Sequence, residues 1–206
     1  MPATEVYGTA RGPFARYASP LAARARRRRH ERFFGLCGVE PGMRLLDVGC
    51  GSLGLRALEP GLDITGVDLA PRPQYPGPFV QADATEHLPF EDKSFDLVYC
   101  SSVVEHVPVA RRGALAAELR RVARGWFVQT PAWSFPLEPH ALLPLAHWLP
   151  EALRRRYWRL GAAPWEDDLR LLRRREVETL FGPARAERVG PLTKSWVVIA
   201  PVGTLT

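Results

Sequence analysis

The chain has 206 residues, of which 46% are hydrophobic and 24% are charged. This length and composition indicate one globular domain with a full-sized core, and they exclude a mainly disordered chain. The formal net charge is +6, but all except two of the 28 basic residues are arginine. We interpret this skew, together with the abundant Ala, Pro and Gly, as a coding bias. Nucleic acid is therefore not expected as the main partner.

The sequence has no apolar stretch of about 18 residues, which predicts that no helix crosses a membrane. No apolar core follows the Arg26–Arg29 run, so no secretory signal is expected. Three widely spaced cysteines without a CxxC pair argue against a disulfide framework or a cysteine zinc site. We expect a cytoplasmic protein with reduced thiols.

The first part of the chain predicts an arm or loop over residues 1–19 and a helix over residues 20–36. The arginines of this helix are interpreted as a solvated face, with an acidic substrate or a membrane surface as alternatives. Residues 43–48 then predict a buried strand that runs into a glycine-rich turn at residues 49–54. A short helix is expected to follow this turn, to about Leu58.

Beyond this point, four further strands are predicted at residues 62–68, 79–83, 94–100 and 125–130, and a helix at residues 109–124. Strands and helices at this spacing are typical of parallel βαβ units. The C-terminal part differs, because it predicts a short helix at residues 173–181 and paired strands at residues 184–189 and 195–200. An insertion rich in Pro, Trp and Leu occupies about residues 131–169.

The turn Gly49-x-Gly51-x-x-Gly54 fits a dinucleotide fingerprint between a strand and a helix. The same turn also fits an S-adenosylmethionine (SAM) site, and Asp47 separates the two. A carboxylate two residues before the first glycine would repel the negative charge of a pyrophosphate. The same carboxylate would attract SAM, because SAM carries a positively charged ammonium and sulfonium. The charge argument therefore favours SAM.

Two further aspartates end the next strands. Asp68 lies 21 residues after Asp47 and is placed to accept hydrogen bonds from ribose hydroxyls, a role that also fits NAD. Asp83 ends the third strand and is placed to accept from the adenine amino group. A single strand-end Asp is commonly a turn or helix cap, but three on consecutive strands beside a glycine turn indicate a site.

At this point the chain resembles the class I SAM-dependent methyltransferases, in particular their broad small-molecule group. The resemblance covers residues 43–130, with a compatible tail at 184–200, and rests on Leu45-Leu46-Asp47-Val48-Gly49-Cys50-Gly51-Ser52, Gly66-Val67-Asp68, Gln81-Ala82-Asp83-Ala84, Leu88-Pro89-Phe90 and Ser94-Phe95-Asp96-Leu97-Val98. It implies a Rossmann-like seven-stranded sheet in an α/β fold, mostly parallel, with an antiparallel last strand beside the fifth and helices on both faces. One departure is Leu53, which stands where the common turn has a glycine.

The resemblance also implies how one domain over residues 1–206 is organised. Residues 1–42 are an arm and helix, residues 43–130 the SAM-binding core, residues 131–169 an acceptor cap, and residues 170–206 a helix and strand pair. The implied cofactor is S-adenosyl-L-methionine. The residues expected to bind it are Asp47, Gly49, Cys50, Gly51, Asp68, Leu69, Asp83, Ala84 and Ser101.

Methyl transfer from a sulfonium is an in-line displacement on an activated donor, so positioning supplies much of the catalysis. A hydroxyl or amine acceptor also benefits from a general base. The candidates are His106, just past the fourth strand, and His140 in the insertion; a structural or substrate-positioning role remains the alternative for each. No metal is expected, because the ends of strands four and five offer poor ligands for a hard cation.

The insertion supplies aromatic and apolar side chains for an acceptor with a ring or an apolar body. Its candidate acceptor-binding residues are Trp133, Phe135, Glu138 and Trp148, with packing inside the insertion as the alternative. The arginines at residues 154–159 are expected on an exposed helix face. Recognition of an anionic head group and contact with a membrane surface stay open for them.

The sequence thus predicts SAM-dependent methylation, at oxygen, of a small-molecule or a lipid- or glycan-linked acceptor. Peripheral membrane contact and the oligomeric state are left open. The alternatives are a non-catalytic SAM-binding protein, an RNA methyltransferase and an NAD(P)-dependent oxidoreductase.

Overall fold

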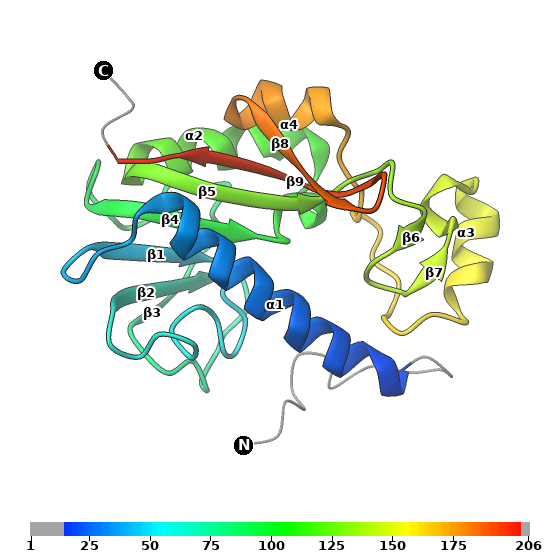
Figure 1. Cartoon of the computed structure of the whole chain (residues 1–206), viewed down its shortest axis with the longest axis horizontal. Coiled ribbons are helices and arrows are strands. Elements are labelled where there is room, and N and C mark those ends of the chain that lie inside the picture. The colour runs from blue at the N-terminus through cyan, green and yellow to red at the C-terminus, as the bar shows by residue number, and fades with distance from the viewer. Residues whose placement is uncertain (1–14, 203–206) are drawn as a thin grey trace.

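A seven-stranded sheet forms the centre of the computed structural model, which describes residues 15–202 and, in its first helix, the side chains of Arg24 and of residue 27 onward. The strands lie in the order β3-β2-β1-β4-β5-β9-β8 (Figure 1). Their bounds are β1 Arg44–Val48, β2 Asp63–Asp68, β3 Phe79–Gln81, β4 Phe95–Ser101, β5 Ala123–Pro131, β8 Ala184–Val189 and β9 Leu192–Ala200.

The first five strands are parallel, whereas β9 runs antiparallel between β5 and β8. In the β5–β9 pair, Trp126 lies opposite Ala200 and Thr130 opposite Trp196. The expected Rossmann-like sheet with an antiparallel last strand beside the fifth is therefore confirmed. Because the parallel strands end at one edge, the segments that follow β1, β2, β4 and β5 meet there.

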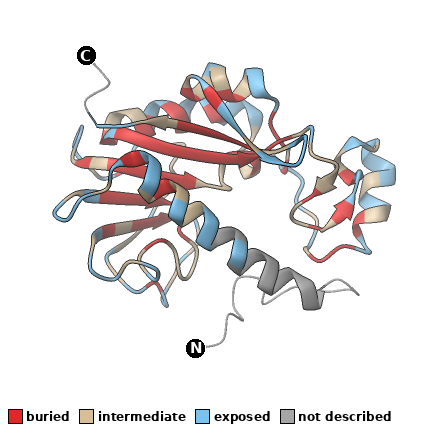
Figure 2. Ribbon diagram, viewed as in Figure 1, coloured by how far each residue is buried: buried red, intermediate tan, exposed pale blue. Residues whose placement is uncertain are grey.

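Helices cover both faces of the sheet, as the sequence predicted. On one face, α1 (Ala15–Cys37) inserts the fully buried Phe33 against Tyr99 and Phe127. On the other, α2 (Arg112–Val122) and α4 (Arg174–Phe181) pack against β5 and β9. Side chains of each strand alternate between the two cores, so the inner strands are buried throughout (Figure 2).

The helix expected after the glycine turn is wrong, because residues 51–58 form consecutive turns instead. Gly51 and Gly54 both have positive φ, at 60° and 55°, which interrupts a right-handed helix. The Leu55 amide donates to the Asp47 carboxylate rather than to a carbonyl one turn earlier. Binding of this amide by a strand-end carboxylate thus takes the place of the first helical turn.

Two helix boundaries also differ from the sequence prediction. Helix α1 begins at Ala15, so the predicted arm is wrong for residues 15–19, and its remainder, residues 1–14, lies outside the described residues. The helix predicted at residues 109–124 is shorter, because Val109–Arg111 is a 3-10 turn (η2) and Ala123 already begins β5.

The insertion lies beyond the carboxyl ends of β4 and β5, at the right of Figure 1. It contains the hairpin of β6 (Leu137–Glu138) and β7 (Leu143–Pro144), the 3-10 turn η3 (Ala146–Trp148) and helix α3 (Glu151–Trp158). Ala141, Leu143, Ala146, Trp158 and Leu169 give it a small core of its own. A further 3-10 turn, η1 (Val104–His106), follows β4. Within residues 15–202, no helix is long and apolar enough to span a membrane.

Gly125 allows the β4–β5–β9 region to pack closely. A Cβ at this position would lie 2.4 Å from the Ala200 carbonyl oxygen and 2.8 Å from Leu97 Cδ2. We expect Gly125→Ala to lower the free energy of unfolding by about 1–3 kcal/mol in urea denaturation. The control is Gly113→Ala in α2, where a Cβ meets nothing within 4 Å and a gain of about 0.5–1 kcal/mol is expected. Equal stability of the two variants would contradict this packing.

Candidate functional site

A cavity of about 260 Å³ opens between the glycine turn, the ends of β1 and β4, and helix α1. Of the residues expected to bind the cofactor, Asp47, Gly49, Cys50, Gly51 and Ser101 line it. Other lining residues were missed by the sequence analysis: Arg29, Arg72 and Tyr99. Leu53, which replaces the common glycine, also contributes to the wall.

Asp47 is only 2% exposed and forms the floor of this cavity. Its Oδ2 accepts a 2.6 Å hydrogen bond from the Leu55 amide. Burial raises the pKa of Asp47 to about 7, although the Leu55 hydrogen bond opposes the shift and the nearby Asp68 adds to it. A Cβ at Gly54 would lie 2.5 Å from this carboxylate, so the turn admits only glycine there.

Asp68 lies at the end of β2, and its carboxylate links the turns that follow β1 and β2. Its Oδ2 accepts from the Gly51 amide at 2.9 Å, and its Oδ1 accepts from the Ala70 amide and from Arg72, each at 3.0 Å. Leu69, directly after the carboxyl end of β2, is 70% exposed. For the Asp68 carboxylate to accept hydrogen bonds from ribose hydroxyls, as the sequence predicts, the Arg72 side chain would have to leave Oδ1.

Asp83 follows β3 and lies outside the cavity wall. Its Oδ1 accepts from the amide and hydroxyl of Thr85, and its Oδ2 is 3.1 Å from Arg111. Burial opposes a shift to lower pKa, but the Thr85 hydrogen bonds and Arg111 outweigh it and hold the pKa of Asp83 below its usual value. Ala84 is half-buried beside it. The adenine role of these two residues stays a prediction.

The side of the cavity nearest the insertion is polar. Ser101 donates to Gln129 Oε1 at 2.7 Å, and Arg29 from α1 donates to the Ser102 hydroxyl at 3.2 Å. The Arg29 Nε is buried and has no hydrogen-bond partner among the described residues. Helix α1 thus places one cation opposite the Asp47 carboxylate.

The two histidines named as base candidates lie together, with ring centroids 4.8 Å apart. His106 Nδ1 is 2.6 Å from Glu166, and His140 Nδ1 is 2.7 Å from Glu138. His140 Nε2 faces the fully buried Glu105 at 3.8 Å. Burial opposes a raised pKa, but Glu138, Glu105 and Glu166 outweigh it and raise the pKa of His140 above its usual range.

Glu105 connects this pair to the sheet, because its Oε2 accepts from the Thr130 hydroxyl of β5. Its Oε1 has no hydrogen-bond partner among the described residues. Ligand atoms of Glu105, His106 and His140 lie within 4.8 Å of one another, a grouping that could also hold a metal ion and that sequence spacing did not indicate.

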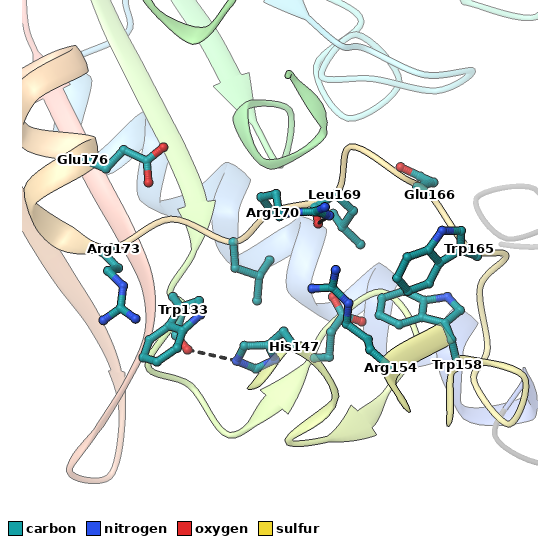
Figure 3. A pocket seen from close by; sticks show the side chains of 12 residues that line it. Trp133, His147, Arg154, Trp158, Trp165, Glu166, Leu169, Arg170, Arg173 and Glu176 are labelled. Carbon is teal, nitrogen blue, oxygen red and sulfur yellow. Dashed lines mark hydrogen bonds between the residues drawn. The ribbon is translucent and has the colours of Figure 1, made fainter. Parts of the chain in front are cut away.

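A second cavity, of about 220 Å³, lies under the insertion (Figure 3). Of the predicted acceptor-binding residues, Trp133 and Glu138 line it. Phe135 and Trp148 do not belong to its wall, and Trp148 is 42% exposed while its indole donates to the Trp133 carbonyl. Arg154 and Trp158, from the segment for which the sequence left recognition of an anionic group open, also line it. The sequence analysis missed several further lining residues: Trp165, Glu166, Arg170 and Arg173.

The strand order and the inserted antiparallel β9 are those of the class I SAM-dependent methyltransferase fold, and the cavity that contains Asp47 lies beside the glycine turn. Residues 46–127 match the family described as "Methyltransferase domain". Residues 46–127 are therefore similar to a methyltransferase domain, and SAM is the cofactor of the methyltransferases that share this fold.

Curated relatives match only in part. The chain is 33% identical over 103 residues to 2-methyl-6-phytyl-1,4-hydroquinone methyltransferase of Synechocystis, covering 44% of this chain and 31% of the relative. It is also 33% identical over 114 residues to the sterol 24-C-methyltransferase ERG6B of Gibberella zeae, covering 47% of this chain and 29% of the relative. Each match thus spans about a third of the relative's length.

Among solved structures, the fold is similar to that of magnesium protoporphyrin IX methyltransferase from Synechocystis with bound SAH. The TM-score is 0.57 at 14% identity, over 94% of this chain and 90% of the other. At this identity the likeness concerns the fold.

The buried Asp47 yields a prediction for stability. Its folded pKa of about 7 exceeds the roughly 3.9 of an unfolded chain, so the folded state binds an extra proton between these values. The free energy of unfolding of the wild type should therefore fall as pH rises from about 4 to 7. Asp47→Asn should not show this fall, because asparagine does not ionise. We expect the variant's advantage in unfolding temperature to be small at pH 5 and largest at pH 8.

Asp63→Asn at the exposed start of β2 is the matched control, and its stability relative to wild type should change little over this pH range. An advantage of Asp47→Asn that stays constant from pH 5 to 8 would contradict the burial of an ionisable carboxylate.

Proposed function

We propose that the protein transfers a methyl group from SAM, bound in the cavity beside the glycine turn, to a hydroxyl of an acceptor presented beneath the insertion. The observation that carries this proposal is the buried Asp47 carboxylate at the floor of that cavity. A pyrophosphate would meet repulsion there, whereas the SAM ammonium and sulfonium supply the missing positive charge.

The cavity is complementary to a zwitterion. Asp47 is proposed to contact the ammonium group, and Arg29, whose Nε has no hydrogen-bond partner among the described residues, supplies a cation for the methionine carboxylate. Asp68 accepts hydrogen bonds from the ribose hydroxyls once Arg72 yields its place. The positive φ angles of Gly49 and Gly51, at 69° and 60°, allow the turn to follow the cofactor closely.

His140 is the proposed general base, with His106 positioning it. O-methylation leaves a proton on the acceptor oxygen, and His140 Nε2 is the ring nitrogen left free by the Glu138 contact. Glu138 and Glu105 stabilise the imidazolium that forms. The carboxylates holding the two histidines, Glu138 and Glu166, both line the cavity under the insertion, which brings the acceptor to them.

The printed names of the relatives support a small-molecule acceptor. A hydroquinone, a sterol and a magnesium porphyrin are named for proteins that share part of this sequence or this fold. One of those names specifies transfer to carbon, so the choice of oxygen here rests on the histidine pair and its carboxylates. A small-molecule or lipid-linked acceptor fits the aromatic wall of the second cavity.

Calorimetric titration with S-adenosylhomocysteine tests the cofactor site. We expect a Kd in the micromolar range, weakened about tenfold or more by Asp68→Ala, which corresponds to about 1.4 kcal/mol. Asp63→Ala, at the opposite end of the same strand, is the control and should bind like wild type. Preferential binding of NAD⁺ would overturn the SAM assignment.

The base assignment predicts a pH dependence. His140 must be neutral to accept a proton, and its pKa is raised, so the single-turnover rate should increase with pH through a value above about 6.5. His140→Gln should remove this rise and lower the rate about 10²-fold or more. His106→Gln should lower the rate less and keep the pH dependence.

Dialysis against EDTA separates proton transfer from metal chemistry at the same three side chains. An unchanged rate is expected. A rate that falls on chelation and returns with one divalent metal would contradict the base role of His140.

A further inference from the structure

The cavity under the insertion has a mixed aromatic and basic wall. Trp133 from the end of β5, Trp158 from α3 and Trp165 supply the aromatic surface. Arg154, Trp158 and Trp165 gather on one side, and Arg173 lies beside Trp133 on the other, with Arg170 between them (Figure 3). Three guanidinium groups therefore surround one space of about 220 Å³.

The carboxylates in the same wall have partners elsewhere. Glu138 accepts from His140 and from the His140 and Ala141 amides. Glu166 is bound to His106, and Glu176 to the buried Arg112. None of these carboxylates forms an ion pair with a cavity arginine among the described residues, so the three arginines of the wall are left without an ion-pair partner from its three carboxylates.

The three arginines lack such partners. Among residues 15–202, none of them has a carboxylate within ion-pair distance. Arg154 lies over the Trp165 ring at 5.1 Å, and its buried Nε has no hydrogen-bond partner among those residues. Arg170 donates to the carbonyls of Asp167 and Leu169. The Arg173 guanidinium lies 3.6 Å above Trp133.

The neighbouring residue on α3 shows the contrast. Arg155 is exposed, yet it pairs with both Glu151 and Asp167. Arg154 is more buried, and burial together with the positive charge of Arg170 lowers its pKa despite the charges of Glu151 and Glu138. Arg170 is likewise half-buried, whereas Arg173 is exposed. Partial burial of a cation without an anionic partner is unfavourable, and arginines of this kind are suited to bind an anionic ligand.

We propose that this cavity binds an oxyanion of the acceptor, a carboxylate or phosphate attached to an aromatic or other apolar body. This inference rests on the proposed methyl transfer, because only that reaction makes the bound molecule the acceptor. Arginine supplies planar, paired donors that match both oxyanions, and the tryptophans enclose the attached body.

Strand β5 sets the length of such an acceptor. Gln129 contacts Ser101 at the cofactor cavity, Thr130 contacts Glu105 of the histidine cluster, and Trp133 lines the second cavity. Four residues of extended chain span roughly 13 Å. The acceptor must therefore extend from the histidine cluster to the second cavity for its oxyanion to reach the three arginines.

The test uses the full-length chain and phenyl phosphate, with the intrinsic fluorescence of the cavity tryptophans as one readout and calorimetry as the other. We expect phenyl phosphate to bind at least about tenfold more tightly than neutral benzyl alcohol, and more tightly than inorganic phosphate. Arg154→Gln should weaken phenyl phosphate about tenfold, whereas the control Arg155→Gln should leave its Kd unchanged.

A second readout separates ligand binding from structural support. Because Arg154 has no ion-pair partner among the described residues, Arg154→Gln should unfold at a temperature no lower than wild type without ligand. Phenyl phosphate should raise the unfolding temperature of wild type and of Arg155→Gln, but not that of Arg154→Gln. Equal affinity for benzyl alcohol and phenyl phosphate, or an unchanged Kd in Arg154→Gln, would overturn the proposal.

Two parallel measurements distinguish a failure of this proposal from a failure of the cofactor site and from binding to a membrane surface. S-adenosylhomocysteine is titrated into the same proteins, so that failure of the cofactor site is seen independently of the second cavity. Vesicles of phosphatidylcholine with phosphatidylglycerol test a membrane role for the arginines of α3. Vesicle binding that is lost in Arg155→Gln but kept in Arg154→Gln, without binding of phenyl phosphate, would overturn the acceptor assignment in favour of a membrane surface.

Discussion

The burial of the Asp47 carboxylate at the end of β1 is the constraint on which this edge of the molecule depends. A carboxylate that is 2% exposed needs a donor, and the Leu55 amide supplies it. That hydrogen bond requires the chain to double back at Gly54, where the positive φ and the lack of a Cβ are both needed. The turn after β1 is thereby shaped around a negative charge, which distinguishes it from a turn that gathers amide donors around a phosphate.

Strand β5 connects the two cavities: its Gln129 accepts a hydrogen bond from Ser101 of the cofactor cavity, and Trp133, two residues beyond the strand, lines the cavity under the insertion. The cofactor cavity contains the buried Asp47 together with Arg29 and Arg72, whereas the cavity under the insertion has three arginines without carboxylate partners among the described residues. Between them stands the histidine pair, with carboxylates on both sides. In the proposed reaction, this order would place the cationic methyl donor, the general base and the anion-binding pocket in sequence, which keeps the charges of donor and acceptor apart.

Sequence reasoning succeeded where backbone pattern alone decides the structure. Continuous apolar runs predict buried parallel strands, and the end of each run predicts the end of its strand. The sequence alone therefore placed Asp47, Asp68 and Ser101 at one edge of the sheet. It failed where a side chain overrides the local pattern. The segment after Gly54 has helical composition, but the Asp47 carboxylate takes the amide that would begin the helix. Residue spacing alone does not predict a hydrogen bond between the Asp47 side chain and an amide eight residues later.

The second cavity shows a different limit of sequence reasoning. Arg154 and Arg155 are adjacent, and both guanidinium groups lie 5.1 Å from the Trp165 ring centroid. Arg154 nevertheless has no carboxylate partner among the described residues, whereas the more exposed Arg155 pairs with Glu151 and Asp167. Helical periodicity treats the whole arginine run as an exposed face, because the segment that covers Arg154, residues 165–173, comes later in the chain. That segment is fixed by a bridge between Leu172 and Ala132 and by the hydrogen bond from the Arg170 amide to Glu105. The same contacts that anchor the insertion to β5 therefore also decide which arginine faces the cavity and which faces water.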